Sequence, residues 1–160
     1  MRRTIPIRLC AVAVAVGSLT AIPLASPSSA AAGATCSKLV SPPPVTVKGV
    51  SMSNSTVSGC LPVSATGGSG KSATNLKTFV STTTWAGGHG TTVEKIAYKA
   101  TTSPGKCPAG TSHILSTGTV TGGTGAAAKV IKKGDKVTAS VCVNTKTSAA
   151  SLEPGTKYVF

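Results

Sequence analysis

The stretch VTASVCV, residues 137–143, has a clear alternating pattern. Its apolar residues occupy alternate positions, and successive side chains of a β-strand point to opposite faces of a sheet. The pattern therefore predicts a strand that turns one set of residues toward a core: Val137, Ala139, Val141 and Val143. Cys142 then points to the opposite face.

Similar short runs recur along the chain and are separated by glycine-rich turns, such as 67–70, 87–90 and 122–125. Helix signals are nearly absent, and proline stiffens an extended lead-in at Ser41–Pro44. Several short strands with regular turn signals are typical of a β-sandwich or a barrel. We predict an all-β, disulfide-bridged antiparallel β-sandwich, immunoglobulin-like or related. The expected strands are Val45–Met52, Thr56–Val63, Leu76–Trp85, Thr92–Ala100, His113–Thr121, Lys129–Ile131, Val137–Val143 and Thr156–Phe160.

The first 32 residues have the pattern of an export signal. Arginines at positions 2, 3 and 8 precede an apolar stretch, Leu9–Leu24, and small residues follow at Ser28–Ala32. Gly17 and Pro23 interrupt the apolar stretch, which is also shorter than the roughly 20 residues that a membrane span needs. We therefore predict a signal peptide at 1–32, a single β domain at 33–160, a secreted extracellular protein and no membrane span after cleavage.

Four cysteines remain after the signal is removed: Cys36, Cys60, Cys107 and Cys142. An even number of cysteines in a small exported domain predicts two disulfides. Three pairings are open, and we favour the two between sequence neighbours because they close the shorter loops. No two cysteines have the close spacing of a zinc site, so no metal is predicted.

The chain is strongly basic, with a formal net charge of +13. Without the three arginines of the signal, 13 lysines face three acidic residues, which leaves 13 − 3 = +10. Such a charge favours an anionic partner, such as a cell-envelope polymer, or another extracellular protein. Specific nucleic-acid recognition is not expected, because residues 33–160 contain no arginine, the residue suited to bidentate phosphate recognition and to stacking on bases.

Few residues are available for catalysis. The histidines are His89 and His113, and the acids are Glu94, Asp135 and Glu153. A Ser-His-acid triad can be assembled from them, but no Gly-x-Ser-x-Gly nucleophile elbow accompanies it. The segment Ala65–Ser72 fits a relaxed phosphate-loop pattern but lacks the strand and helix that this site requires. We predict no enzyme and no cofactor.

One loop is a candidate binding site. Trp85 precedes the glycines around His89, and an exposed tryptophan can present a flat apolar face to a sugar or a protein. The alternative is that Trp85 caps the core. The rest of the core is expected to be mainly aliphatic, because few aromatic residues are present.

The alanine-rich signal and the Thr-, Gly- and Lys-rich remainder with four cysteines resemble small secreted proteins of actinobacteria, many of them uncharacterised. This resemblance of style implies no functional residue. We predict a secreted, non-enzymatic binding or structural protein of the extracellular space or cell envelope. The alternative is an extracellular inhibitor or toxin that acts through a disulfide-pinned loop, for which Ser103–Ala109 is the candidate.

Overall fold

Antiparallel strands make up most of the structure, a computed structural model that describes residues 33–160. The predicted signal peptide and Cys10 lie outside the described residues. In chain order the elements are β1 (Thr35–Ser41), β2 (Val45–Val47), β3 (Val50–Leu61), α1 (Val63–Thr66), β4 (Ser69–Asn75), β5 (Val80–Trp85), the 3₁₀ turn η1 (Ala86–Gly88), β6 (Thr91–Ala100), β7 (Thr111–Gly123), α2 (Ala127–Val130), β8 (Lys136–Asn144), β9 (Ala150–Leu152) and β10 (Tyr158–Val159).

The sheet closes on itself into an eight-stranded barrel rather than the predicted sandwich. Strands β3 to β8 each pair with the next strand along the chain. β1 then pairs with β3 on one side and with β9 and β10 on the other, and β9 and β10 also pair with β8. The prediction of an all-β, antiparallel, disulfide-bridged fold is confirmed.

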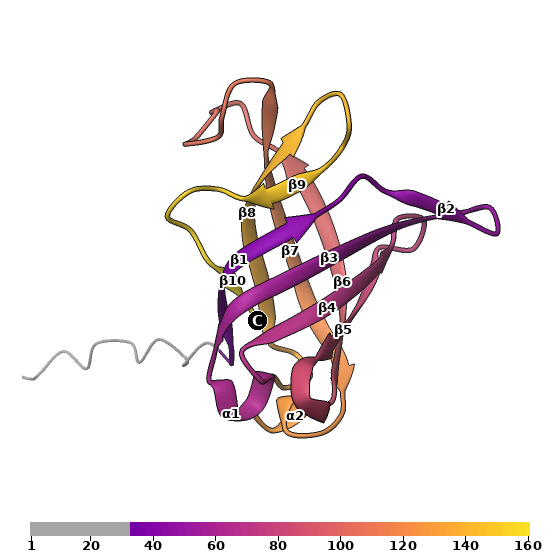
Figure 1. Ribbon diagram of the computed structural model, residues 1–160, viewed down its shortest axis with the longest axis vertical. Coiled ribbons are helices and arrows are strands. Elements are labelled where there is room, and N and C mark those ends of the chain that lie inside the picture. The colour runs from indigo at the N-terminus through magenta and orange to yellow at the C-terminus, as the bar shows by residue number, and fades with distance from the viewer. Residues whose placement is uncertain (1–32) are drawn as a thin grey trace, which may run out of the picture.

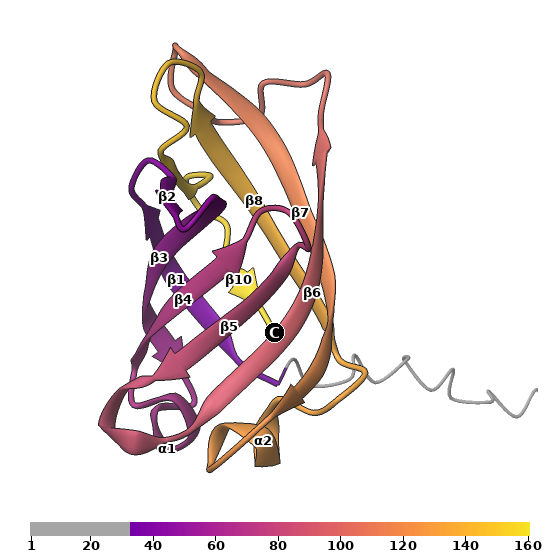
Figure 2. The ribbon, with the colours of Figure 1, turned by 90° about the vertical axis from the view of Figure 1, so that its right-hand side faces the viewer.

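The two ends of the barrel differ, as Figures 1 and 2 show. The short helices α1 and α2 lie together at one end, which we call the closed end. The β2–β3 hairpin and the loops that follow β6 and β8 lie at the other end, which we call the open end. No helix among residues 33–160 has the length and apolar character to cross a membrane.

The packed core fills the half of the barrel nearest the helices. Three aromatic rings meet there: Phe160 lies edge-on to Trp85, with centroids 5.1 Å apart, and to Tyr158, at 4.5 Å. Aliphatic residues surround them, including Val57, Val120 and Ile131. The core is thus mainly aliphatic, as the composition predicts, with a cluster of three aromatic rings packed within it.

Residues 137–143 behave as their pattern predicts. The four small apolar residues face the interior, and Cys142 lies on the outer face, where it bonds to Cys107. The second disulfide joins Cys36 to Cys60, so the favoured pairing is confirmed.

This second bridge lies in the core, although strict alternation from the inward-facing Val57 would place Cys60 on the outer face. Both of its cysteines are fully buried in the core, whereas Leu61 and Val63 are exposed. The reason is Gly59, whose φ of +61° interrupts the alternation and turns Cys60 inward.

Candidate functional site

The half of the barrel toward the open end contains a cavity of about 280 Å³. Its lining extends from Tyr158 to the loop residues Pro44, Leu76 and Ser148 at the open end. An eight-stranded barrel has an interior that side chains can fill or that can hold one small ligand. Here the aromatic core fills one half, and the other half remains hollow because most inward side chains are small.

Hydroxyl groups cover one wall of this cavity. The wall consists of consecutive strands β3, β4 and β5, and we call its lining residues the hydroxyl wall: Ser53, Ser55, Ser72, Thr74 and Ser81. They lie directly opposite one another across the strands, so they form rows rather than isolated polar positions.

The first row crosses four strands. Ser53 lies opposite Thr74, Thr74 opposite Ser81, and Ser81 opposite Glu94 on β6. The Thr74 hydroxyl donates to Ser81 Oγ at 3.1 Å. This row therefore leads across the wall to a buried carboxyl group.

The second row lies nearer the closed end. Ser55 is opposite Ser72, Ser72 opposite Thr83, and Thr83 opposite Thr92. The Ser72 and Thr83 hydroxyls are 2.6 Å apart. At the end of the row, Thr92 Oγ1 accepts a hydrogen bond of 2.8 Å from the indole N–H of Trp85, which links the polar row to the aromatic core.

The opposite wall is apolar. Its residues come from β6 to β9 and from β1, and they are mainly aliphatic: Leu39, Ile96, Ile114, Ala139, Val141, Val143 and Ala150. Ser41 at the end of β1 and Ser116 on β7 are the polar exceptions on these strands, and Tyr98 adds an aromatic ring toward the open end. The cavity thus has two chemically different sides.

Glu94 lies where the hydroxyl wall meets the core, and it is fully buried. The Tyr158 hydroxyl donates to both of its carboxylate oxygens, at 3.2 and 3.1 Å. Burial raises the pKa of Glu94 to about 7, against hydrogen bonds from Tyr158, Ser81 and Thr83 that lower the pKa. Burial, with the charge of Glu94, also raises the pKa of Tyr158.

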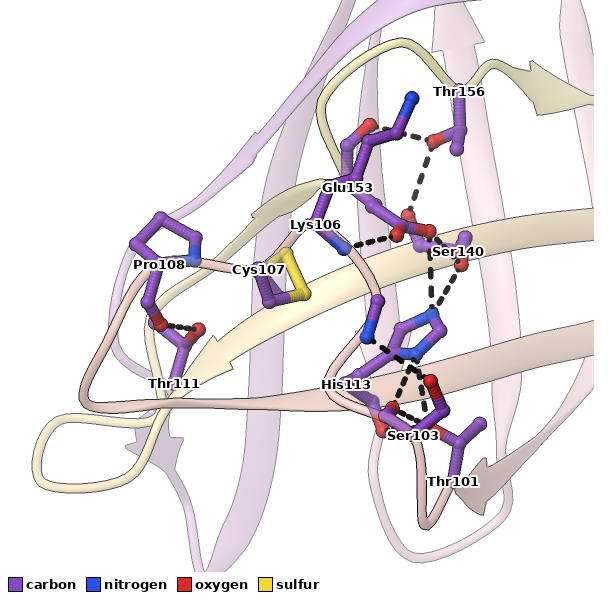
Figure 3. Close-up of a disulfide and its surroundings, with 12 residues drawn as sticks. Thr101, Ser103, Lys106, Cys107, Pro108, Thr111, His113, Ser140, Glu153 and Thr156 are labelled. Carbon is purple, nitrogen blue, oxygen red and sulfur yellow. Dashed lines mark hydrogen bonds and ion pairs between the residues drawn. A yellow bond between two sulfur atoms is a disulfide. The ribbon is translucent and has the colours of Figure 1, made fainter.

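A second polar cluster lies outside the barrel beside the Cys107–Cys142 disulfide (Figure 3). His113 on β7 places its Nε2 atom 2.6 Å from Ser140 Oγ on β8 and 3.3 Å from Glu153 Oε2. The Ser140 hydroxyl donates to Glu153 Oε2 at 2.7 Å. The backbone N–H of Lys106, in the loop after β6, donates to Glu153 Oε1 at 2.6 Å.

This cluster contains the residue types of a hydrolytic triad but not its arrangement. In a triad the serine faces one ring nitrogen of the histidine and the acid faces the other. Here Ser140 and Glu153 both contact Nε2, whereas Nδ1 faces Thr101 Oγ1 at 2.8 Å and the Ser103 carbonyl oxygen at 3.0 Å. The contacts instead attach the loop that contains Ser103–Ala109 to β7 and β8.

The residues of the predicted binding loop lie elsewhere. Trp85 is only 2% exposed and packs on Phe160, so it caps the core and presents no face to a partner. His89 lies at the closed end, where its carbonyl oxygen accepts a hydrogen bond from the Ala127 N–H. A binding role for His89 stays a prediction.

The remaining candidates are dispersed. Asp135 accepts a hydrogen bond from the Lys132 N–H in a turn after α2. The segment Ala65–Ser72 runs from the four-residue helix α1 into β4, without the long helix that a phosphate loop precedes. Within residues 33–160 no cluster of three or more histidines, cysteines or acids could hold a metal ion.

The cavity was not predicted, although its signal is present in the sequence. In SGKSATN (69–75) and VSTTTW (80–85), serine and threonine occupy the alternate positions that face inward. A period of two in small hydroxylated residues is therefore the feature that could have identified the hydroxyl wall. Comparisons of the chain with models of protein families, with curated proteins and with solved structures find no match.

Proposed function

We propose that this protein is a secreted, non-enzymatic binding protein that holds one small molecule inside its barrel. The observation that carries the proposal is the cavity between the hydroxyl wall and the apolar wall. Ligand sites are typically concave and mostly apolar, with a few polar groups that fix orientation. The cavity has this composition, since aliphatic side chains face a small set of hydroxyls.

Export is part of the proposal, and the two disulfides support it. Disulfides form and persist in oxidising compartments such as the extracellular space. The lysines described by the structure are all exposed, so an anionic envelope polymer would contact the outer surface rather than the cavity. Such a partner stays a separate prediction, as does inhibition through the Ser103–Ala109 loop.

A cavity-filling substitution tests the proposal. Ala139 is 4% exposed and lines the apolar wall, so Ala139→Phe places a ring inside the cavity. Its neighbour Thr138 points outward and is exposed, so Thr138→Phe adds the same ring to the outer surface. The probe is 2-naphthol, whose fluorescence anisotropy rises when it binds. An engineered apolar cavity of about 150 Å³ holds benzene, so this larger cavity suits two fused rings.

We expect saturable binding of 2-naphthol to the parent and to Thr138→Phe, and at least tenfold weaker binding to Ala139→Phe. Near-ultraviolet circular dichroism checks that each variant is folded. If Ala139→Phe does not fold, Ala150→Phe provides a second variant with a filled cavity. Equal binding by folded inner and outer variants would contradict the proposal. So would the absence of saturable binding to the parent.

A further inference from the structure

The two walls of the cavity differ in what they can offer a ligand. On the hydroxyl wall, Ser72 and Thr74 are each at least nine-tenths buried, and their side chains line the cavity. Facing them across the barrel, Val141 and Ile114 offer only hydrocarbon. We propose that the cavity selects an uncharged ligand with hydrogen-bonding groups along one side and hydrocarbon along the other. This inference rests on the proposed function and names the ligand class of the same site.

The hydroxyl wall keeps hydrogen-bonding capacity beyond its internal pairs. A serine or threonine hydroxyl has one donor and two acceptor positions, and one cross-strand hydrogen bond occupies only part of these. Thr74, for example, uses its donor on Ser81 and keeps its acceptor positions. Ser55 lines the cavity on the same wall and has no cross-strand hydrogen-bond partner among these pairs. A ligand hydroxyl or carbonyl on this side can therefore bond to several neighbouring groups.

The apolar wall imposes the second condition. A polar group placed against Val141 or Ile114 would lose its hydrogen bonds to water and gain none, which costs free energy. The same group placed against Thr74 would exchange water for protein partners. The cavity thus discriminates by the position of the polar groups on the ligand, as well as by their number.

Charge inside the cavity is unfavourable. No lysine is among the described residues that line it, and the nearby carboxyl group of Glu94 is already engaged by Tyr158. An ionised ligand would therefore lie in a region of low polarity without a counter-charge.

Two isomeric ligands can test whether the position of the hydroxyl groups matters, because they carry the same number of hydroxyls at different places on the ring. Naphthalene-2,3-diol has both hydroxyls on one side, whereas naphthalene-2,6-diol has them at opposite ends. We expect the parent protein to bind the 2,3-isomer roughly tenfold more tightly, the effect of about one hydrogen bond. It should bind 2-naphthoate, the charged probe, more weakly than either diol.

A double variant tests whether the hydroxyl wall causes the preference. Ser72→Ala with Thr74→Val removes two hydroxyls from the wall, and we expect the two diols then to bind within about twofold of each other. Thr84→Val is the control, because Thr84 is exposed on β5 and points outward. It should keep the tenfold preference.

The outcomes distinguish this inference from the proposed function. If the isomers bind the parent equally while Ala139→Phe still weakens both, the cavity binds ligands but the two-sided selection is wrong. The inference would also be overturned if the folded double variant kept the preference for the 2,3-isomer, or if the parent bound 2-naphthoate more tightly than the diols. If neither diol binds the parent, the inference and the proposed function both fail.

Discussion

The hydroxyl of Tyr158 bridges both carboxylate oxygens of Glu94, at 3.2 and 3.1 Å, although the two residues are 64 positions apart in sequence. The pair joins β10 to β6 across the interior of the barrel. Glu94 has no solvent exposure, and burial raises its pKa from 4.5 to about 7. This carboxyl therefore connects proton binding to the stability of the barrel.

We expect the free energy of unfolding to decrease as pH rises from 5 to 8. Between pH 4.5 and 7 the folded protein keeps a proton on Glu94 that the unfolded chain releases, so higher pH favours unfolding. A difference of 2.5 pH units, from 4.5 to 7, corresponds to about 3 kcal/mol. Urea denaturation at several pH values measures the decrease, and Glu94→Gln should remove most of it. A parent protein equally stable at pH 5 and pH 8 would contradict the assignment.

Glu153 should have the opposite dependence at lower pH. The hydrogen bond from the Lys106 N–H, followed by that from Ser140, holds the pKa of Glu153 below its ordinary value. Its contribution to the free energy of unfolding is therefore fully present above the ordinary pKa of a glutamate. It is lost as pH falls through the lowered pKa of the folded protein. Glu153→Gln should accordingly leave the decrease between pH 5 and 8 intact, which makes it the control for Glu94→Gln.

The same residue controls access to the loop after β6. Because Glu153 accepts from the backbone of Lys106, we expect Glu153→Gln to accelerate trypsin cleavage after Lys106 severalfold in the folded protein. Mass spectrometry of the first fragments measures the rate. Asp135→Asn, which changes a carboxylate in a distant turn, should leave it unchanged. Equal cleavage rates in parent and Glu153→Gln would show that the disulfide alone holds the loop.

The two phenylalanines offer a matched test of the core. Phe160 is 1% exposed and contacts two aromatic rings, whereas Phe79 is 41% exposed at the surface. Phe160→Ala should cost about 3–5 kcal/mol of stability, the usual range for a buried ring. Phe79→Ala should cost roughly 1 kcal/mol or less. Urea denaturation followed by Trp85 fluorescence compares them, and similar losses would contradict the position of the core.

Removing either disulfide should destabilise the barrel, but by different amounts. The bridges span 24 and 35 residues, for which restriction of the unfolded chain predicts about 3–4 kcal/mol in both cases. Cys36 and Cys60 are also fully buried, so replacing both with alanine creates a core cavity. We expect the double replacement of Cys36 and Cys60 with alanine to lower the melting temperature more than the double replacement of Cys107 and Cys142. The reverse order would show that holding the loop at Cys107 contributes more to stability than the buried Cys36–Cys60 bridge.

Local patterns predicted the strands with alternating aliphatic residues but missed those built on small polar ones. Residues 137–143 form part of β8 as expected, because their valines alternate. Neither β1 nor β4 is among the expected strands: no strand is predicted before the lead-in at Ser41–Pro44, and the glycine-rich turn at 67–70 overlaps the start of β4. The predicted strand Lys129–Ile131 is wrong, because the short helix α2 occupies most of it.

Closure of the barrel depends on pairings between distant segments, which local alternation does not encode. Cys36 lies opposite Cys60 on one side of β1 and opposite Tyr158 on the other. Nothing in residues 35–41 specifies these partners, so sandwich and barrel could not be separated from the sequence. The cavity depends in turn on closure, because its volume is the space left when small side chains of opposite strands face one another.

Because side chains alternate along each strand, the inner and outer surfaces of the barrel are formed by different residues of the same strands. On β4, Ser72 and Thr74 face the cavity while Lys71 and Ala73 face solvent. A substitution at an inward position can change what the interior accepts and leave the outer charge as it is, and the converse also holds. Ligand preference and surface chemistry can therefore diverge separately, in evolution or by design, on an unchanged backbone.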